Sequence, residues 1–422
     1  MTKVIIGAGI SGLYTAIKLR KAGVLDIVVY DPRAGHYTRP GHLNLSVFRQ
    51  AEEGTGIEAW PASKTGHIKD LERSLYAKAK ELGIKIENKR FIRLHEDEKK
   101  PGVVIADDTG TEEIVEGEYV FDCTGNRREV VSAVNRLIPE SPLQLKPITE
   151  LPVRHHFIAY VKISDSNWRQ FERAEERISN LPETIDALEY ARSIIKLRAL
   201  GWRELKYPRI YGRQFGKEKV CVYLHEPENL SKDQYEQWVQ TALETYTSPI
   251  HFAQLPASPH PKPRFMAFTS DAQALEQVSY KGRNLPIVTA LGDAQIDFDY
   301  ALAHGILDGM RRIDSLIEHM NIIEGRIWYF DSKDYMLELG EQVRQHKEAV
   351  ANAAERLKRA FTRALELAPL KFRQAIASST DDAEKTIMRD VLKEIEARNS
   401  YLKARQLFSD FHDRARPCRH EE

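Results

Sequence analysis

The sequence predicts an α/β fold that is interrupted by a sheet-rich section and followed by a helical tail. Three observations carry this prediction. A short buried strand, a glycine-rich turn and a helix follow one another over residues 4–23. A second buried strand, at residues 286–291, also runs into a turn that contains glycine. Between them the pattern changes to alternating strands, so we expect the first and last blocks to form one discontinuous domain.

The composition excludes several classes of protein. The 422 residues include 62 Lys and Arg and 62 Asp and Glu, so the net charge is zero and we expect no nucleic-acid partner. The three cysteines form no close pair, and His155-His156 lacks a third ligand nearby, so we expect neither a disulfide framework nor a metal site. No apolar run of about 18 residues occurs, and no signal peptide precedes the first strand. We therefore expect a cytoplasmic protein without a membrane span.

The opening block has the pattern of a dinucleotide-binding unit. A strand at residues 4–6 leads into a glycine-rich turn, a helix follows, and a second strand at 27–30 ends at Asp31. The residues of the turn are Gly7, Ala8, Gly9, Ile10, Ser11 and Gly12. In such a unit the first glycine permits the tight turn, the second lets a pyrophosphate approach the backbone, and the third lets helix and strand pack closely.

The same unit predicts two further ligand contacts. A pyrophosphate at the start of the helix would meet backbone N–H groups that have no partner within the helix. Asp31 ends the second strand, where its carboxylate can accept hydrogen bonds from ribose hydroxyls. The alternative is a glycine turn between a strand and a helix that binds no ligand.

The remaining elements of the first block follow in order. Residues 32–66 show no clear periodicity and carry several Gly and Pro, which predicts a long loop system. The apolar spacing predicts an amphipathic helix over 68–82. Strands are expected at 84–94, 103–107 and 119–121, and the last of them leads into Asp122-Cys123-Thr124-Gly125.

The middle section, residues 146–284, predicts a separate sheet. Residues 157–163 alternate like a strand, and residues 183–200 have helical spacing. Two strands, 210–215 and 220–225, are joined by a short segment that contains glycine, which indicates a hairpin.

The last part of the chain predicts helices. A helix with an apolar face follows the strand at 286–291 and Gly292-Asp293. From about residue 331 to 411 the sequence is charged and helical in its spacing. One apolar stripe of this tail contains Met388, Val391, Leu392, Ile395 and Leu402.

At this point the chain resembles the FAD-dependent monooxygenases and their relatives. The resemblance rests on the N-terminal glycine turn, on Asp122-Cys123-Thr124-Gly125, and on Gly292-Asp293 at the end of a late strand. It implies a Rossmann-like FAD-binding domain (1–145 and 285–325), an inserted mixed β-sheet substrate domain (146–284) and a C-terminal α-helical subdomain (326–422). It further implies that Asp293 contacts the ribityl chain and that Gly305 lies in the segment facing the pyrimidine edge of the flavin.

More cofactor residues follow from the same resemblance. Asp31-Pro32-Arg33 matches the acid-x-arginine pattern that closes the second strand in these flavoproteins. The loop around Arg39 resembles that of the MICAL-type and styrene monooxygenases, which implies contact with the FAD phosphates or with the flavin. Ile92 aligns with a residue whose backbone meets the adenine. The chain departs from the pattern at Tyr300, where proline is expected, and at Ala303, where glycine is expected.

The candidate catalytic residues are His304, Arg213 and Tyr223. His304 precedes Gly305 and could donate to a flavin carbonyl or move a proton, or it could simply begin the helix. Arg213 and Tyr223 lie on the predicted hairpin with Tyr211 and His225, where they could line a polar substrate pocket or form an ordinary outer sheet face.

The expected function is that of an FAD-dependent oxidoreductase, most specifically a monooxygenase that inserts one oxygen atom by way of a flavin hydroperoxide. NADPH, NADH or a separate reductase would supply electrons to act on a small-molecule or protein substrate. The chain lacks the tryptophan-rich signature of the flavin-dependent halogenases. Two alternatives stay open: a flavin dehydrogenase or reductase, and an FAD-fold effector whose helical tail engages a protein partner.

Overall fold

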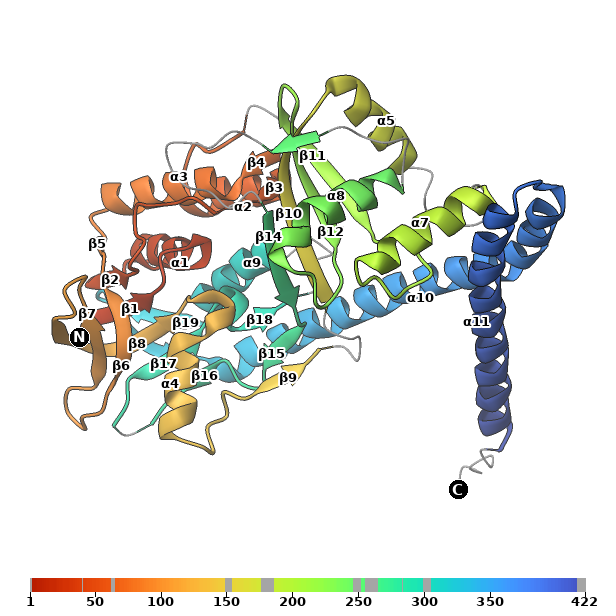
Figure 1. The fold of residues 1–422 in the computed structure, drawn as a ribbon. Coiled ribbons are helices and arrows are strands. Elements are labelled where there is room, and N and C mark those ends of the chain that lie inside the picture. The colour runs from red at the N-terminus through yellow and green to blue at the C-terminus, as the bar shows by residue number, and fades with distance from the viewer. Residues whose placement is uncertain are drawn as a thin grey trace. The chain divides into compact units, whose positions relative to one another are not determined.

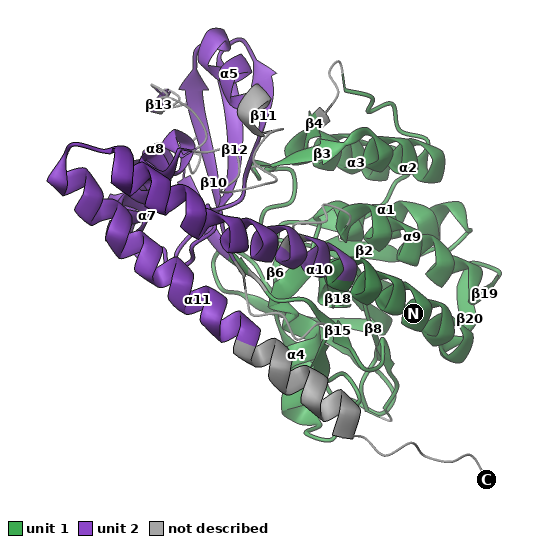
Figure 2. Cartoon of the chain, turned by 90° about the vertical axis from the view of Figure 1, so that its right-hand side faces the viewer, with its two compact units in different colours: residues 1–154, 269–351 green, residues 155–268, 352–422 purple. Residues whose placement is uncertain are grey.

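The chain forms two compact units in a computed structural model. The structure describes residues 2–39, 41–61, 65–148, 154–175, 186–245, 252–254, 265–282, 284–298 and 305–415. Unit 1 consists of residues 1–154 and 269–351, and unit 2 of residues 155–268 and 352–422 (Figure 2). The first and last α/β blocks therefore lie in one unit. The units are defined by packing alone, so the division into three functional domains stays a prediction.

Unit 1 is built on an eight-stranded sheet (Figure 1). Its main path runs β16-β17-β8-β1-β2-β5, and β7 and β6 continue from β8. The strands are β1 (Thr2–Ile6), β2 (Ile27–Tyr30), β5 (Lys85–Glu87), β6 (Arg90–His95), β7 (Gly102–Ala106), β8 (Glu112–Asp122), β16 (Ser279–Tyr280) and β17 (Ile287–Ala290).

Parallel pairing brings the two sequence motifs to one edge of this sheet. β1 pairs in parallel with both β2 and β8, and β8 pairs in parallel with β17. Asp122 stands opposite Ile6 on one side and opposite Ala290 on the other. The carboxyl ends of three strands therefore meet where the glycine turn, the Asp122 segment and Gly292-Asp293 begin, which is where ligands bind in open α/β sheets.

The sheet has a hydrophobic core on each face. Ile5, Val29 and Phe121 pack in one core with α1 (Ile10–Lys21), α2 (Leu45–Thr55), α3 (Ile68–Glu81) and α9 (Gly305–Glu318). Val4, Val28 and Val120 pack in the other core with α4 (Glu129–Leu137). This division follows from the alternation of side chains along each strand, and burial on both faces explains why the strands are continuous apolar runs.

The prediction of an extended loop over residues 32–66 is wrong. The segment contains β3 (His42–Asn44), helix α2 and the start of β4 (Thr65–His67), which pairs with β3. Its glycines serve close packing as well as turns. A Cβ on Gly54 would lie 1.9 Å from the Tyr14 hydroxyl, and one on Gly66 would lie 2.3 Å from the Phe48 ring.

Other differences concern strand boundaries and short elements. The single strand expected at 84–94 is two strands, because β5 pairs in parallel with β2 whereas β6 pairs antiparallel with β7. A small sheet of unit 1 and a following hairpin were not predicted. They consist of β9 (Leu145–Pro147), β15 (Gln273–Leu275), β18 (Ile296–Asp297), β19 (Met320–Ile323) and β20 (Arg326–Phe330).

Unit 2 contains a second, antiparallel sheet of five strands in the order β11-β12-β10-β13, with β14 also paired to β10. The strands are β10 (Arg154–Ile163), β11 (Ile210–Gly216), β12 (Lys219–His225), β13 (Phe252–Gln254) and β14 (Phe265–Ser270). The predicted hairpin is confirmed, with Glu218 in the left-handed region at its turn. In the part of unit 2 that the structure describes, three α-helices accompany the sheet, and only α7 was predicted: α5 (Asp165–Glu175), α7 (Ala187–Ala199) and α8 (Tyr235–Glu244).

The helical tail is also confirmed. It consists of α10 (Ser332–Ser378) and α11 (Asp382–Ala415). Met388, Val391, Leu392 and Ile395 of α11 are buried in the core of unit 2 together with Phe157 of its sheet. Among the described residues, no helix is long and apolar enough to cross a membrane.

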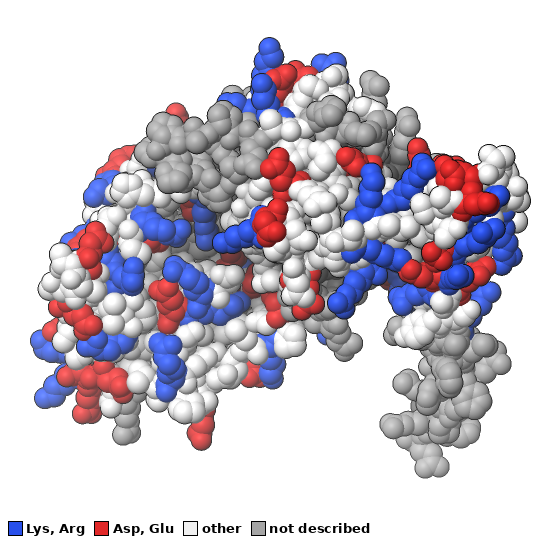
Figure 3. Space-filling view, viewed as in Figure 1, with Lys and Arg blue, Asp and Glu red and all other residues white. Residues whose placement is uncertain are grey.

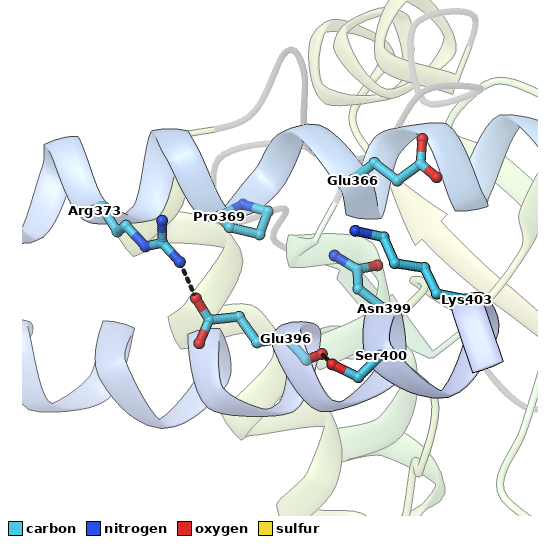
Figure 4. A pocket seen from close by; sticks show the side chains of 7 residues that line it. All are labelled: Glu366, Pro369, Arg373, Glu396, Asn399, Ser400 and Lys403. Atoms are coloured by element: carbon cyan, nitrogen blue, oxygen red, sulfur yellow. Dashed lines mark hydrogen bonds and ion pairs between the residues drawn. The ribbon is translucent and has the colours of Figure 1, made fainter.

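α10 contains a proline whose effect is compensated by α11. Pro369 has no N–H, so it cannot donate to the carbonyl of Leu365 one turn earlier. Asn399 Nδ2 donates to that carbonyl instead, at 2.8 Å. A cavity of about 400 Å³ lies beside this contact. Figure 4 shows the side chains that line it, among them Arg373 and Glu396, which form an ion pair at 2.6 Å.

Candidate functional site

The glycine turn between β1 and α1 has two glycines that the protein itself requires. Gly7 has a φ of +104°, and a Cβ there would lie 2.4 Å from the Cys123 carbonyl oxygen. A Cβ on Gly12 would lie 1.9 Å from the carbonyl oxygen of Gly7. These close approaches are the tight turn and the close helix–strand packing that the motif demands.

Gly9 is different. Its backbone has a negative φ, and a Cβ there would have only one neighbour within 4 Å, Glu72 Oε1 at 3.8 Å. Neither strain nor protein packing therefore requires glycine at this position. Close approach of a ligand to the backbone at the N-terminus of α1 does require it. We call the open space beside Gly9 at the N-terminus of α1 the cradle, and this cradle fits a dinucleotide.

Ser11 joins the two motifs that are far apart in the sequence. Gly292 has a φ of +62°, and a Cβ on it would lie 2.2 Å from Ser11 Oγ. The Gly292-Asp293 turn is thus in contact with the first turn of α1. The structure brings Gly7, Gly9, Ser11, Gly12 and Asp293 to one region of unit 1.

Asp31 clamps the glycine turn to the end of β2. Its buried carboxylate accepts a hydrogen bond from Ala8 N at 2.9 Å and another from Arg33 N at 2.7 Å. The Arg33 side chain is half exposed, with Nε 3.6 Å from Asp31 Oδ1. A carboxylate can accept further hydrogen bonds beyond these, so contact between Asp31 and a ribose stays a prediction.

Sequence reasoning missed Glu72, a buried carboxyl beside this turn. Glu72 lies on α3 with 1% of its surface exposed, and its Oε2 has no hydrogen-bond partner among the described residues. Burial raises the pKa of Glu72 to about 7, and the positive charges of Arg39 and Arg33 oppose this rise. The only signal in the sequence was an acid next to Leu71 on the predicted apolar face.

Asp293 and Arg39 face the same region. Asp293 is exposed to solvent, yet the surrounding protein raises the pKa of its carboxyl, and Arg39, Arg312 and Arg128 oppose that rise. The positive charge of Arg39 lowers the pKa of both Glu72 and Asp293, so Arg39 acts on a carboxyl beside each of the two turns.

Two buried arginines near Asp293 were also missed. Arg128 donates from Nε to the Ala294 carbonyl at 3.3 Å and from Nη1 to the Asn126 carbonyl at 3.0 Å. Arg312, on α9, donates from Nε to Gln295 Oε1 at 2.8 Å, and burial lowers its pKa. Arg128 Nη2 and Arg312 Nη1 have no partner among the described residues. Such buried positive groups favour an anionic ligand nearby, because an unpaired buried charge is costly.

The Asp122-Cys123-Thr124-Gly125 segment is structural in this molecule. The Asp122 carboxylate accepts hydrogen bonds from Thr124 N and Oγ1 and from Val130 N and Val131 N at the start of α4. Burial raises the pKa of Asp122, and these bonds oppose the rise. Burial also raises the pKa of the Cys123 thiol, which argues against a reactive thiolate.

The remaining cofactor predictions fall at the edges of the site. Ile92 is the extra residue at an irregularity in the pairing of β6 with β7, between Phe91 and Arg93, so its backbone is outside the regular ladder. Gly305 is the first residue of α9. His304, like Tyr300 and Ala303, lies outside the described residues.

Arg213 and Tyr223 lie on one face of the sheet in unit 2. Tyr223 stands opposite Tyr211, with their rings stacked at a centroid distance of 4.8 Å, and Arg213 stands opposite Cys221. Tyr223 is buried and Arg213 is exposed. Val222 and its neighbours on the other face pack into the core of unit 2. The pairing places Tyr211, Arg213 and Tyr223 on the same face of the sheet, and the catalytic role of Arg213 and Tyr223 stays a prediction.

Charged and potential metal-binding side chains are the remaining groups that could form a site. Lys and Arg are interspersed with Asp and Glu on the face seen in Figure 3. Within the described part of the chain, no group of three or more His, Cys, Asp or Glu is placed to hold a metal ion.

Comparison with known proteins agrees with this geometry. Residues 5–39 match the family of NAD(P)-binding Rossmann-like domains. This segment spans β1, the glycine turn, α1, β2, Asp31 and Arg39. No curated protein sequence matches the chain.

Solved structures extend the likeness over the whole fold. A triple mutant of the flavin-dependent brominase Bmp2 is similar with a TM-score of 0.54 and 13% identity, covering 93% of this chain and 99% of the brominase. A flavoprotein/dehydrogenase from Cytophaga hutchinsonii has a TM-score of 0.53 and 11% identity, covering 96% of both chains.

The 2-methyl-3-hydroxypyridine-5-carboxylic acid oxygenase has a TM-score of 0.50 and 16% identity, covering 86% of this chain and 95% of that one. At these identities the likeness shows the fold. The chain shares with these three proteins an α/β fold with a Rossmann-like sheet, additional sheets and a helical C-terminal region.

Proposed function

We propose that this protein binds FAD in unit 1 and acts as an FAD-dependent oxidoreductase, most specifically as a monooxygenase. The observation that carries the proposal is the cradle at Gly9, whose glycine the protein does not need for its own packing. Arg39 and Asp293 face the same region, as expected for residues that contact the phosphates and the ribityl chain. The fold of the flavin-dependent brominase and of the oxygenase supports the choice of FAD over a nicotinamide.

Each residue has a distinct proposed task. The N–H groups that open α1 and the guanidinium of Arg39 bind the pyrophosphate. Asp31 keeps the glycine turn in place through Ala8 N and accepts from the ribose. Asp293 accepts from the ribityl hydroxyls. The buried guanidinium groups of Arg128 and Arg312 add positive charge around the bound cofactor.

Bound FAD would accept a hydride from its electron donor and activate dioxygen when reduced. One oxygen atom would enter the substrate and the other would leave as water. The protein's part is to hold a substrate near the flavin and to exclude bulk water. We propose Arg213 and Tyr223 as substrate-binding residues because they share one polar and aromatic face of a sheet. We also propose His304, which precedes Gly305 in the sequence, as a proton donor.

The donor and partners follow from the same proposal. NADPH or NADH would reduce the flavin from a transient site, or a separate reductase would supply electrons. The substrate is a small molecule or a protein, and the helices α10 and α11 are a proposed surface for a protein partner.

The first test is the absorbance spectrum of the purified protein, with the flavin identified after denaturation. We expect FAD near one equivalent per chain, or binding of added FAD with micromolar affinity or better. A protein that neither retains FAD nor binds it on titration contradicts the proposal.

The second test separates oxygen insertion from dehydrogenation. With substrate and labelled dioxygen, a monooxygenase places one labelled atom in the product, which mass spectrometry detects. The second candidate is a flavin dehydrogenase, which the fold of the Cytophaga hutchinsonii flavoprotein/dehydrogenase favours. It would give an oxidised product without label. An effector with the FAD fold would show no reduction by NADPH, by NADH or by a reductase.

A further inference from the structure

Glu72 is the protein group nearest to the cradle at Gly9. Its Oε1 lies 3.8 Å from the position that a Cβ on Gly9 would take, and its Oε2 has no partner among the described residues. The side chain is 1% exposed. A buried carboxyl with one unpartnered oxygen therefore lies beside the N-terminus of α1, where the proposed diphosphate binds.

The surroundings of Glu72 include charges of both signs. Burial raises the pKa of Glu72 to about 7. The ionised form is favoured by the positive charges of Arg39, Arg33 and Arg73, and the neutral form by the negative charge of Asp31. Tyr37 also faces Glu72, and its phenol has a raised pKa through burial. The positive charges only partly offset the cost of burying a carboxylate, so Glu72 changes its protonation state close to neutral pH.

We propose that Glu72 holds the cofactor diphosphate as a protonated carboxyl, donating a hydrogen bond to a phosphate oxygen, so that binding takes up one proton. An ionised carboxylate at this distance from a diphosphate would repel it, whereas a neutral carboxylic acid has a donor to offer. The inference rests on the proposed binding of FAD and names a residue that makes this binding depend on pH.

The sign of the pH dependence follows from the linkage of binding and protonation. Below the pKa of the free protein, about 7, Glu72 already carries its proton and affinity does not change with pH. Above it, binding must first add the proton, so Kd rises by up to about tenfold per pH unit. If Glu72 instead bound a ribose hydroxyl as an ionised acceptor, deprotonation would favour binding, and Kd would fall over the same range.

The experiment measures Kd for FAD and for ADP-ribose from about pH 6 to about pH 8.5, in the intact chain and in Glu72→Gln. ADP-ribose carries the same diphosphate without the flavin. We expect Kd of the unaltered protein to rise with pH for both ligands. Glu72→Gln keeps the size and a donor but cannot ionise, so its Kd should stay low and constant. Glu81→Gln, an exposed change on the same helix, is the matched control and should behave like the unaltered protein.

Calorimetry in buffers of different ionisation enthalpy gives a second measurement that needs no variant. About one proton should be taken up per FAD near pH 8 and close to none near pH 5.5. A constant or falling Kd, no proton uptake at either pH, or a pH slope that survives in a folded Glu72→Gln overturns the role of Glu72. If FAD binds at no pH, the proposed function itself has failed, and the two failures are thereby distinguished.

Discussion

Gly9 is the residue whose substitution should weaken FAD binding and leave the fold intact. In Gly9→Val the new Cβ has only Glu72 Oε1 within 4 Å in the protein, at 3.8 Å, so the fold should survive. The valine would instead stand in the path of the diphosphate. We expect FAD affinity to fall by at least about tenfold, since the loss of one or two hydrogen bonds costs that much.

Fluorescence titration with FAD measures the effect, and circular dichroism reports on folding. Gly12→Val is the contrasting variant, because its Cβ would overlap the Gly7 carbonyl oxygen and should prevent folding. Full FAD affinity in folded Gly9→Val would mean that the cofactor does not approach α1 at this glycine.

Glu226 makes stability depend on pH in unit 2. Burial raises the pKa of Glu226 to about 8 from an ordinary value of 4.5, and its Oε2 has no partner among the described residues. Because the folded state holds this proton more tightly than the unfolded state, the stabilisation is complete below the ordinary value and is lost as pH rises through about 8.

The melting temperature of the protein should therefore fall between about pH 4.5 and about pH 8, and Glu226→Gln should reduce that fall. Differential scanning calorimetry of both proteins measures it. Glu228→Gln, an exposed neighbour, serves as the control and should leave the pH dependence unchanged. Equal pH dependence in Glu226→Gln and the unaltered protein would show that Glu226 titrates normally.

At the scale of elements, the contact between α10 and α11 at Pro369 can be tested by a double-mutant cycle. Asn399→Ala removes the donor to the Leu365 carbonyl and should cost about 1 kcal/mol in the free energy of unfolding. Pro369→Ala restores the N–H of a regular helix and should stabilise α10 by up to about 3 kcal/mol.

The two changes should not be additive. With Ala at 369, the Leu365 carbonyl has a helical donor and Asn399 is dispensable, so Asn399→Ala should then cost little. Urea unfolding of the single and double variants gives the coupling free energy. Additive effects would mean that Asn399 does not compensate for the proline.

The elements differ in how well sequence patterns reveal them. The hairpin of β11 and β12 was predicted because its alternation and its turn lie within sixteen consecutive residues, 210–225. Helix α2 was missed because Gly54 within it and Gly66 after it are residues typical of loops. Their real role, close packing against Tyr14 and Phe48, depends on partners from α1 and from α2 itself.

For the molecule as a whole, α11 should be indispensable to unit 2. Its Ile395 is fully buried in the same core as Phe157 and Val222 of the sheet. Ile395→Ala should lower the free energy of unfolding by about 2–5 kcal/mol, as for other buried aliphatic side chains.

Removal of all residues after Ser379 would take away Met388, Val391, Leu392 and Ile395 together and should give insoluble protein or a strong increase in binding of a hydrophobic dye. Lys393→Ala, at an exposed position of the same helix, is the control and should be close to neutral. A soluble truncated protein with unchanged melting behaviour would show that α11 is a separate appendage.

The sequence by itself determined the parts of this protein whose logic is local. The dinucleotide unit, with its strand, glycine turn, helix and Asp31, lies within the first 31 residues. The apolar spacing that predicts α9 and the helical tail is local in the same sense, because it lies within the helices themselves. Only the tertiary structure decided which charges surround the cradle. Glu72, Arg128 and Arg312 come from segments that are far apart in the sequence, and no sequence pattern predicts that these segments lie together. A buried side chain's hydration, partners and proton affinity depend on which distant segments pack around it, and that packing is a property of the folded chain.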